Sequence, residues 1–516
     1  MKRFIQRFAD KVIGVLSGFD RLVFRGTLRA VAFVDGLKRV LWKRQVLLKD
    51  FGDWAQSLTR TVIEASRAEA GRKERPIRYL PSGGTDKEAL ARKIAREDGI
   101  TEGLIAVLES VEPCRTYDIY RNKQTKRLDL VSRIRKCKYL YHYFIDPVFG
   151  FMNARIQTWL PFSVQICLNG REWLSREMDR AGIGYRRREN TFVQIDDVPG
   201  AQKLLDRQLK VRWPIQLSRL ARLLNPAHGK MFRGLDLEYY WSVYQSEWAT
   251  DIMFESATAL AQIYPDLVQY GIRNFSSPDV MRFLAQKPHW NLKKEVKTSF
   301  KDRAEGVRIK HWVGENSVKL YDKEGSVLRT ETTINDPYGF KVFRAKEGEP
   351  QGELSYRPLR AGIADLHRRA QVSQASNDRY LEALAAVDPA TPLGELMNPV
   401  VRPTSYGGKR VRGLRPWSPE DLALLKAVNR GEFSINGFRN RDLAPLLFEG
   451  DPASPEDKRR RSGRVSRQLR MLRAHGLIRK VASAYRYVLT DKGRQTINAI
   501  LSAHAVTLEQ LRKAAA

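Results

Sequence analysis

The chain has 516 residues, which is too long for one compact core and predicts roughly three or four domains. Hydrophobic residues make up 42% of it and aromatic residues 10%, which is enough for buried cores and excludes a wholly disordered chain. The 91 Lys and Arg residues against 58 Asp and Glu give a net charge of +33, an excess that disfavours an enzyme of small metabolites. It indicates a polyanionic partner instead, because each phosphate that a protein neutralises releases condensed counterions. We therefore expect a nucleic-acid partner, with DNA first and RNA as the alternative.

The sequence also predicts where the protein works. Its cysteines are Cys114, Cys137 and Cys167, with no C-x-x-C pair, which argues against a disulfide framework or a thiolate zinc site and fits a reducing compartment. No window reaches about 18 uninterrupted apolar residues, so no membrane span and no membrane partner are expected. The basic start resembles a signal peptide, but Asp10 and Lys11 interrupt its apolar stretch. We expect a cytoplasmic protein.

The elements in chain order predict an α+β multidomain protein. The pattern is mostly helical from Phe4 to about Ala70, apart from one strand-like run, and aromatic and β-branched residues become frequent near Cys114. The predicted divisions are a mainly helical N-terminal region at 1–112, an α+β strand-rich domain at 113–200, a helical region at 201–388, a Pro- and Gly-rich linker at 389–416 and a C-terminal domain at 417–516. The two strand-rich blocks lie at about 114–170 and at 307–344.

Two charged groups along the way are candidate sites. Arg186, Arg187 and Arg188 follow one another and are candidates for phosphate contacts. Glu247 and Asp251 lie four residues apart in a stretch expected to be helical, so they would share a helix face and could bind a divalent cation. The alternative for this acidic pair is a helix cap or a salt bridge.

The block at 307–344 is predicted to be an antiparallel meander whose strands alternate between apolar and polar side chains. Val318, Leu320, Leu328 and Ile334 form the apolar face. The polar face carries a base, a phenol, a guanidinium and a carboxylate, which are Lys319, Tyr321, Arg329 and Glu331.

This polar face has the groups needed to act on a phosphodiester. Glu331 could hold Mg²⁺ or Mn²⁺ with Asp322 or a remote acid, since hard cations prefer oxygen ligands. Lys319 and Arg329 could neutralise the phosphate, and Tyr321 could attack it. The alternative is a solvated sheet face with cross-strand Lys–Glu pairing.

The string N-S-V-K-L-Y-D-K followed by L-R-T-E, within residues 316–331, resembles a segment of the rolling-circle replication initiators of plasmids and filamentous phages. The resemblance covers about 30 residues and implies a strand-nicking activity. It touches Ser317, Lys319, Tyr321, Asp322, Lys323, Arg329 and Glu331. The chain lacks the His-hydrophobic-His metal pair, because His142 has no second histidine nearby, so only the class that works through carboxylates is implied.

The C-terminal domain begins with a strong helix signal at Ser418-Pro419-Glu420-Asp421, and Ser454-Pro455-Glu456-Asp457 repeats it before an arginine-rich helix. In that helix Val465, Leu469 and Leu472 form one buried stripe, and Gly476 ends it. Two short strands follow, joined by a turn at 482–484, and then a last helix. From residue 401 onward there are 24 Lys and Arg against 10 Asp and Glu.

This order of helices with a β-wing is that of a winged helix-turn-helix, whose third helix fits a major groove. The stretch VSRQLRMLRAHGLIRKV…YRYVLTDKGR resembles winged-helix regulators of the MarR-like type over roughly the last 100 residues. The alternative is a winged helix used only for protein contacts. The predicted nucleic-acid-binding residues here are Arg459, Arg460, Arg461, Arg464, Arg467, Arg470 and Arg486.

Together these patterns favour a nucleic-acid-binding protein of mobile-element or plasmid type. In this interpretation the 307–344 sheet makes it a metal-dependent DNA-nicking initiator or nuclease. The alternative is a non-enzymatic binder, either a DNA-binding regulator or the protein part of a ribonucleoprotein. Net charge does not separate the two, because DNA and RNA share the phosphate.

Overall fold

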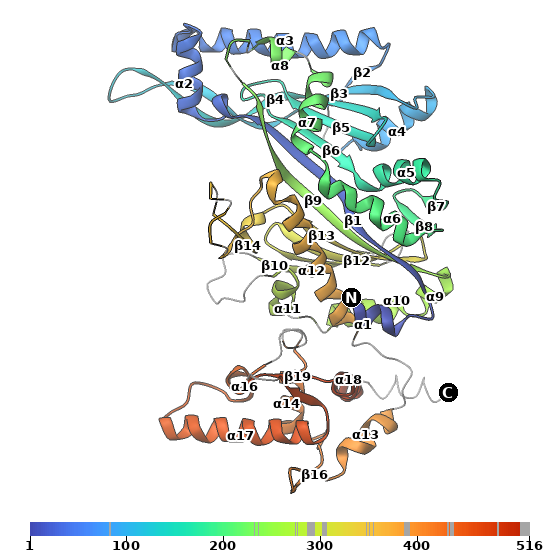
Figure 1. Ribbon diagram of the computed structural model, residues 1–516. Coiled ribbons are helices and arrows are strands. Elements are labelled where there is room, and N and C mark those ends of the chain that lie inside the picture. The colour runs from blue at the N-terminus through green and yellow to red at the C-terminus, as the bar shows by residue number, and fades with distance from the viewer. Residues whose placement is uncertain are drawn as a thin grey trace. The chain divides into compact units, whose positions relative to one another are not determined.

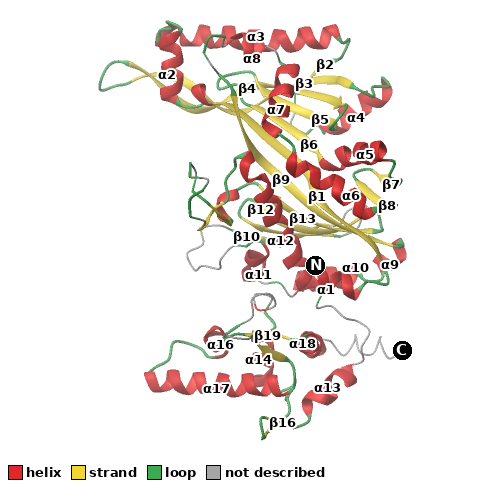
Figure 2. Cartoon of the chain, in the orientation of Figure 1, coloured by secondary structure: helices red, strands yellow, loops and turns green. Residues whose placement is uncertain are grey.

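A computed structural model gives the structure of the protein. It describes residues 1–516 except 82–83, 226, 232, 236, 274, 276, 286–294, 302–306, 347, 350, 354, 386–392, 431–432, 434–437, 482–484 and 506–516. Helices and strands are mixed along the whole chain (Figure 2). No helix among the described residues is both long enough and apolar enough to cross a membrane.

The chain divides into two compact units, and neither is one continuous segment. Unit 1 comprises Met1–Val15, Asp251–Thr332 and Ser373–Ala516, and unit 2 comprises Leu16–Thr250 and Thr333–Val372. Two long strands, β1 (Val12–Leu28) and β9 (Tyr239–Phe254), contribute residues to both. This arrangement differs from the linear succession of domains expected at 1–112, 113–200 and 201–388, because long-range strand pairing joins segments that are distant in sequence.

Unit 2 is built on a sheet of strand order β9-β1-β6-β5-β4-β3-β2 (Figure 1). The further strands are β2 (Ile77–Tyr79), β3 (Gly103–Arg121), β4 (Leu128–Asp146), β5 (Gly150–Gln157) and β6 (Val164–Asn169). The sheet is mixed, since β2 pairs parallel with β3 while β3, β4, β5 and β6 pair antiparallel in succession. The strand-rich block expected at about 114–170 therefore exists, and it begins earlier than expected.

Helices cover both faces of this sheet. The main ones are α2 (Val34–Lys43), α3 (Phe51–Arg72), α4 (Lys87–Glu97), α5 (Gly170–Ala181), α6 (Val198–Asp206), α7 (Trp213–Leu224) and α8 (Ala227–Met231). His142 of β4 lies 3.1 Å from the Ser66 hydroxyl of α3, and the Lys87 ammonium of α4 lies 4.8 Å from the Tyr141 ring centroid. Because neighbouring strand residues point to opposite faces, α3 and α4 lie on opposite sides of β4.

The expectation of a mainly helical N-terminal region at 1–112 is wrong for two of its segments. Residues 12–28 form the 17-residue strand β1, and every second residue from Leu16 to Leu28 is buried. Residues 103–112 belong to β3. The helical expectation holds for α2, α3 and α4.

The helical expectation for residues 201–290 is also wrong in part, because residues 239–254 form β9. Its residues from Trp248 to Phe254 are all buried, so the strand shows no alternation of apolar and polar residues that would separate it from a buried helix. Glu247 and Asp251 consequently do not share a helix face. Four residues along a strand span about 13 Å, which is too far for one ion to bind both carboxylates.

Unit 1 contains the strand order β10-β11-β12-β13-β9 and short helices. The strands are β10 (Val296–Lys301), β11 (Arg308–Val313), β12 (Asn316–Lys323) and β13 (Val327–Ile334), and the helices are α1 (Lys2–Arg7), α9 (Ala257–Ala261), α10 (Tyr264–Arg273) and α11 (Ser277–Phe283). The long helix α12 (Leu366–Leu384) packs on this sheet, with the Tyr380 hydroxyl 3.0 Å from His311 Nε2 and the Asn377 amide donating to the Thr330 carbonyl at 3.0 Å. Three of the four strands expected at 307–344 are therefore present in this sheet, as β11, β12 and β13, whereas residues 341–344 pair with residues 355–358 in a separate hairpin. β13 is buried on both faces.

Two hairpins of unit 2 lie between residues 113 and 388 and are not part of the large sheet. β7 (Tyr185–Arg188) pairs antiparallel with β8 (Thr191–Ile195). β14 (Lys341–Arg344) pairs antiparallel with β15 (Ser355–Pro358), and the short helix η4 (Pro337–Gly339) precedes it.

The C-terminal part of unit 1 has its own hydrophobic core. Its elements are α13 (Leu393–Val401), β16 (Thr404–Tyr406), β17 (Lys409–Val411), α14 (Pro419–Val428), α16 (Asn440–Leu447), α17 (Pro455–Ala474), β18 (Ile478–Lys480), β19 (Tyr487–Leu489) and α18 (Asp491–Ala505). The core includes Val400 and Leu414 together with Leu424, Leu469 and Leu472. The linker expected at 389–416 is therefore wrong for its described residues, which fold as α13 and a hairpin and pack into this core.

Candidate functional site

Helix α17 presents a row of arginines on one side. The Ser454 hydroxyl accepts a hydrogen bond from the Asp457 amide at 3.1 Å, which caps the helix, and Pro455 occupies its first turn. Val465, Leu469 and Leu472 face the core as predicted. The side chains left exposed include Arg459, Arg460, Arg464, Arg467 and Arg470.

Some of these arginines already have partners on the protein. Arg460 and Arg461 both pair with Asp457 at 2.8 Å in the first turns of the helix. Arg464 Nη2 lies 2.9 Å from Glu420 Oε1, at the start of α14. In the described part of the chain, the guanidinium group of Arg467 makes no ion pair or hydrogen bond, so its charge remains available for a ligand.

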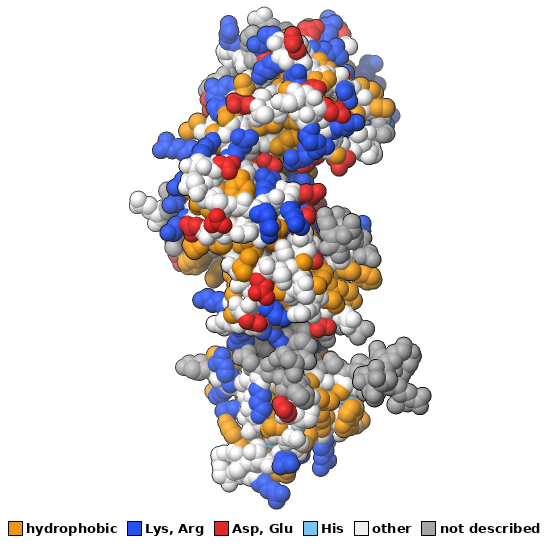
Figure 3. Space-filling view, turned by 90° about the vertical axis from the view of Figure 1, so that its right-hand side faces the viewer, with side chains coloured by type: hydrophobic (Ala, Val, Ile, Leu, Met, Phe, Trp, Pro, Cys, Tyr) orange, Lys and Arg blue, Asp and Glu red, His pale blue; other side chains and the backbone are white. Residues whose placement is uncertain are grey.

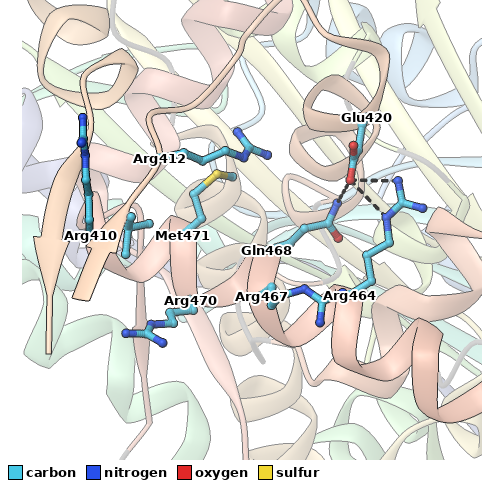
Figure 4. A pocket seen from close by; sticks show the side chains of 9 residues that line it. Arg410, Arg412, Glu420, Arg464, Arg467, Gln468, Arg470 and Met471 are labelled. Carbon is cyan, nitrogen blue, oxygen red and sulfur yellow. Dashed lines mark hydrogen bonds and ion pairs between the residues drawn. The ribbon is translucent and has the colours of Figure 1, made fainter. Parts of the chain in front are cut away.

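A basic pocket of about 360 Å³ lies beside α17. Its walls come from α17, from the start of α14 and from the β16–β17 hairpin with the residue after it, and Figure 4 shows Arg464 and Gln468 pointing toward Glu420. Within the described residues, the Arg410 guanidinium has no ion-pair partner either. The lining side chains are Arg410, Val411, Arg412, Glu420, Arg464, Arg467, Gln468, Arg470 and Met471. Five arginines against one carboxylate make this pocket strongly positive.

Arg410 and Arg412 were not expected to belong to a binding site, because residues 389–416 were interpreted as a linker. A signal was present, since Lys409-Arg410-Val411-Arg412 follows Gly407-Gly408, a pair with positive φ that makes the tight turn of a hairpin. A basic strand after such a turn predicts a charged hairpin.

Two short strands follow α17. β18 pairs antiparallel with β19, and Phe438 forms an additional antiparallel bridge to Tyr487, with backbone hydrogen bonds of 2.8 and 2.7 Å. Arg486 is half-buried beside Tyr485, which is exposed. The turn expected at 482–484 lies outside the described residues.

The polar residues of β12 and β13 contact one another in unit 1. The Lys319 ammonium lies 2.6 Å from Glu331 Oε1, and the Tyr321 hydroxyl donates to Glu331 Oε2 at 3.0 Å. Glu331 is only 1% exposed. Burial alone would raise the pKa of this carboxyl, but the charges of Lys319 and Arg329 and the tyrosine hydroxyl hold that pKa below its ordinary value. Glu331 is therefore ionised and paired.

Arg329 lies beside this group and is also buried, at 1% exposure. Its Nε and Nη2 atoms contact the two carboxylate oxygens of Asp251 at 2.5 and 2.9 Å. The two bases and two acids balance in charge. The alternative interpretation, a solvated sheet face with cross-strand Lys–Glu pairing, is right about the pair and wrong about the solvent, because Glu331 and Arg329 are buried.

The expected pairing of Glu331 with Asp322 around a metal ion is not formed. Asp322 lies on the opposite face of β12 from Lys319 and Tyr321, because strand residues alternate, and it is close enough to the Tyr264 phenol to affect its pKa. Asp251 is held by Arg329. Glu247, in unit 2, accepts a hydrogen bond from the Gln245 amide at 2.9 Å.

The three arginines of β7 do not all point the same way, because neighbouring residues of a strand alternate between its two sides. Arg187 is anchored to the protein, with Nη2 2.7 Å from Glu172 Oε1 and Nη1 3.1 Å from the Ser175 hydroxyl. Arg186 and Arg188 point the other way and are exposed. Only these two are placed to contact a phosphate.

Basic side chains are spread widely over the protein. On the face shown in Figure 3, Lys and Arg side chains are scattered from end to end, with acidic side chains between them.

Comparison of the chain with protein-family models, with curated proteins and with solved structures finds no match.

Proposed function

We propose that residues 393–505 form a winged helix-turn-helix module that binds duplex DNA through α17. The order α14, the Phe438 bridge, α16, α17, β18, β19 and α18 is that of a winged helix, with α17 as the recognition helix and β18–β19 as the wing. The wing strand β18 ends in Arg479 and Lys480, both exposed. An α-helix fits the major groove of a duplex, and a basic wing reaches the adjacent phosphates.

The single observation that carries this proposal is the pocket of arginines beside α17. Like charges gathered at one place destabilise a fold unless an anion neutralises them. The pocket has Arg410 on the hairpin and Arg467 on the helix without protein partners among the described residues. We assign them to phosphates of the bound duplex.

The test is a salt-dependent binding measurement on the full chain. The variant R464A/R467A should bind duplex DNA more weakly, by up to about 2–3 kcal/mol, because it removes Arg467, which is unpaired among the described residues, and leaves Glu420 without its arginine. The slope of log K against log salt should fall by about 1, since Arg467 is the one of the two assigned to a phosphate. The matched control is K93A/R96A, which removes two exposed positive charges from α4. If both variants lose affinity equally, the binding depends on net charge alone and α17 is not the interface.

A second candidate function, phosphodiester cleavage, rests on the hydrogen bond from the Tyr321 hydroxyl to Glu331. A phenol that donates to an ionised carboxylate is a nucleophile with a base in place. Lys319, whose ammonium contacts the same carboxylate, could neutralise an incoming phosphate. Mg²⁺ or Mn²⁺ would need Glu331 as a ligand, and to bind the ion Glu331 would first have to give up its contact with the Lys319 ammonium.

The cleavage assay uses supercoiled and single-stranded DNA with Mg²⁺ or Mn²⁺, scored for nicks and for a denaturation-resistant protein–DNA adduct. Tyr321→Phe should abolish the adduct, because it deletes only the phenolic oxygen, and Glu331→Gln should abolish nicking. Wild-type protein that binds DNA and leaves it intact would establish the non-enzymatic alternative, a DNA-binding regulator or a ribonucleoprotein component. Nicking would support a mobile-element or plasmid-type initiator or nuclease.

A further inference from the structure

The β14–β15 hairpin of unit 2 carries a pair of exposed aromatic rings. Phe343 and Tyr356 are direct partners across the two strands, and their ring centroids are 5.3 Å apart. Phe343 is 55% exposed and Tyr356 is 73% exposed. Burying such rings is normally favourable, so an exposed aromatic pair at adjacent strand positions indicates a ligand that covers it.

The opposite side of the hairpin is fixed to the unit. Val342 and Arg344 alternate with the exposed residues of β14 and are buried. Arg344 Nε lies 3.7 Å from the buried Asp365 carboxylate of the same unit. Two hydrogen bonds close the base of the hairpin, from Arg344 Nη2 to the Pro358 carbonyl at 3.0 Å and from the Leu359 amide to the Phe340 carbonyl at 2.8 Å. The rings therefore stand on a supported surface.

Behind the rings lies an excess of positive charge. The buried Asp365 carboxylate receives Arg360 at 3.1 Å and Arg368 at 2.8 Å, and Arg344 lies 3.7 Å from it. Three guanidinium groups around one carboxylate leave two charges unbalanced.

One further cation lies on the ring face of the hairpin, and another lies behind it. Lys341 is exposed on the same side of β14 as Phe343. Arg357 alternates with Tyr356 on β15 and is the cross-strand partner of Val342, so it lies on the buried side, near Arg344. Within the described residues the Arg357 guanidinium has no ion pair or hydrogen bond, which adds to the excess of positive charge behind the rings.

We propose that this hairpin binds a single-stranded nucleic acid, with unpaired bases stacking on Phe343 and Tyr356 and backbone phosphates contacting Lys341. Exposed aromatic rings within a positive surface are the arrangement that holds single strands, because every base has a face that can stack. A duplex hides those faces within its own stack. The hairpin thus contacts unpaired nucleotides, which is a different activity from the duplex binding proposed for α17.

The test compares the full-length protein with F343L/Y356L, which keeps apolar side chains and removes the rings. Binding is measured by fluorescence anisotropy with labelled single-stranded dT₂₀, with an abasic strand of equal length and with a duplex. The double variant should bind dT₂₀ roughly tenfold more weakly, since stacking on one aromatic side chain accounts for about that factor. Its binding to the abasic strand and to the duplex should match that of the wild type.

Further variants separate stacking from charge and from folding. Tyr356→Phe keeps the ring and should bind dT₂₀ like the wild type, whereas Lys341→Gln should weaken dT₂₀ and the abasic strand alike and reduce the salt slope. Photocrosslinking of a 5-iodouracil strand to the unaltered protein should label Phe343 or Tyr356, a result that does not depend on how a variant folds.

Equal affinity of F343L/Y356L and wild type for dT₂₀, or crosslinks that map only elsewhere, would overturn the proposal. So would loss of the crosslinks to this hairpin at a lower concentration of an acidic peptide than of unlabelled dT₂₀, because it would identify the hairpin as a protein-docking surface. The variant R464A/R467A provides the opposite control. It should weaken duplex binding, and adding F343L/Y356L to it should lower the affinity for dT₂₀ by the same factor as in the wild type. Failure of the α17 proposal is therefore distinguishable from failure of this one.

Discussion

The guanidinium group of Arg412 reaches both carboxylate oxygens of Asp421, with Nη1–Oδ2 at 2.7 Å and Nη2–Oδ1 at 2.6 Å. The backbone amide of Arg415 donates to the same carboxylate at 2.8 Å. Asp421 is completely buried in the first turn of α14, while the Arg412 side chain remains 42% exposed. This pair ties the segment before α14 to the helix and places Arg412 at the edge of the basic pocket.

Asp421→Asn should destabilise the C-terminal module. The amide keeps the shape but removes the charge-assisted hydrogen bonds, and because Arg412 is partly solvated the loss should be about 1–2 kcal/mol. The measurement is the free energy of unfolding by urea. The double variant D421N/R412M should recover part of the loss, because it no longer leaves the guanidinium without its carboxylate. Equal stability of D421N and wild type would show that the pair contributes nothing.

The boundary of the module is a second prediction. A fragment starting at Leu393 should fold and unfold cooperatively, because it contains Val400 and Leu414 of the core as well as Arg412. A fragment starting at Arg415 lacks all three and should be less stable by several kcal/mol, since each buried aliphatic side chain contributes about 1.5–3 kcal/mol. Circular dichroism during urea titration distinguishes the two. Fragments of equal stability would restore the linker interpretation of residues 389–416.

Glu420→Gln should tighten duplex binding. Glu420 holds Arg464 at 2.9 Å and faces the basic pocket, so its removal frees one arginine and deletes the one negative charge of the pocket lining. We expect a several-fold gain in affinity at low salt that shrinks as salt is added. Glu97→Gln, which removes an exposed acid from the end of α4, is the matched control. A gain of the same size in both variants would attribute the effect to net charge.

Lys319 and Glu331 should be strongly coupled in stability. Lys319→Met alone leaves the buried Glu331 carboxylate without its lysine, which typically costs about 3–5 kcal/mol when a buried pair loses one partner. Adding Glu331→Gln should restore much of that loss. A double-mutant cycle in urea unfolding measures the coupling. If the single and double variants are equally unstable, Lys319 acts through packing and the charge pair is unimportant.

Part of the fold could be predicted from the sequence. Three strands of the meander at 307–344 were predictable because their turns and alternating residues are regular, although the last strand, β14, pairs with β15 instead. Helix α17 was predictable because Ser454 and the stripe of Val465, Leu469 and Leu472 mark it clearly. Of strand β1 only the run from Leu22 to Phe24 was expected to be extended, and the rest of the strand was missed for a specific reason. Gly18 and Gly26 occupy two of its inward positions, where a Cβ would lie 2.4 Å from Leu205 and 2.7 Å from Trp241, so residues that signal no strand are required by the packing.

The sequence predicted many of the residues that form the candidate sites, but it did not predict how those residues are buried or paired. The sequence identified Lys319, Tyr321, Arg329 and Glu331 as one group, and three of the four contact Glu331 directly or affect its pKa. Their burial was not predictable, because the layers that cover β13 come from distant segments such as α12. The Phe343–Tyr356 pair was missed as well, because no strand was expected at residues 355–358, which are the partner of β14.

Acid should destabilise the protein through its buried histidines, of which His311 in β11 is the clearest. Its ring lies 2.9 Å from the Thr298 hydroxyl and 3.0 Å from the Tyr380 hydroxyl, and burial lowers its pKa from 6.5 to about 4. The folded state therefore holds the neutral ring at a pH at which the unfolded chain binds a proton. The stabilisation is complete above pH 6.5 and is lost as the pH falls from there to about 4.

The shift of this one histidine corresponds to about 3 kcal/mol across that window, since one pKa unit is worth about 1.4 kcal/mol. His311→Gln should lower stability at neutral pH but reduce the dependence of the unfolding free energy on pH between 4 and 6.5. Urea unfolding at several pH values checks this. His142 and His228, whose pKa values burial also lowers to about 4, should keep a residual slope in the variant. An identical slope in wild type and His311→Gln would show that this ring takes up its proton without unfolding.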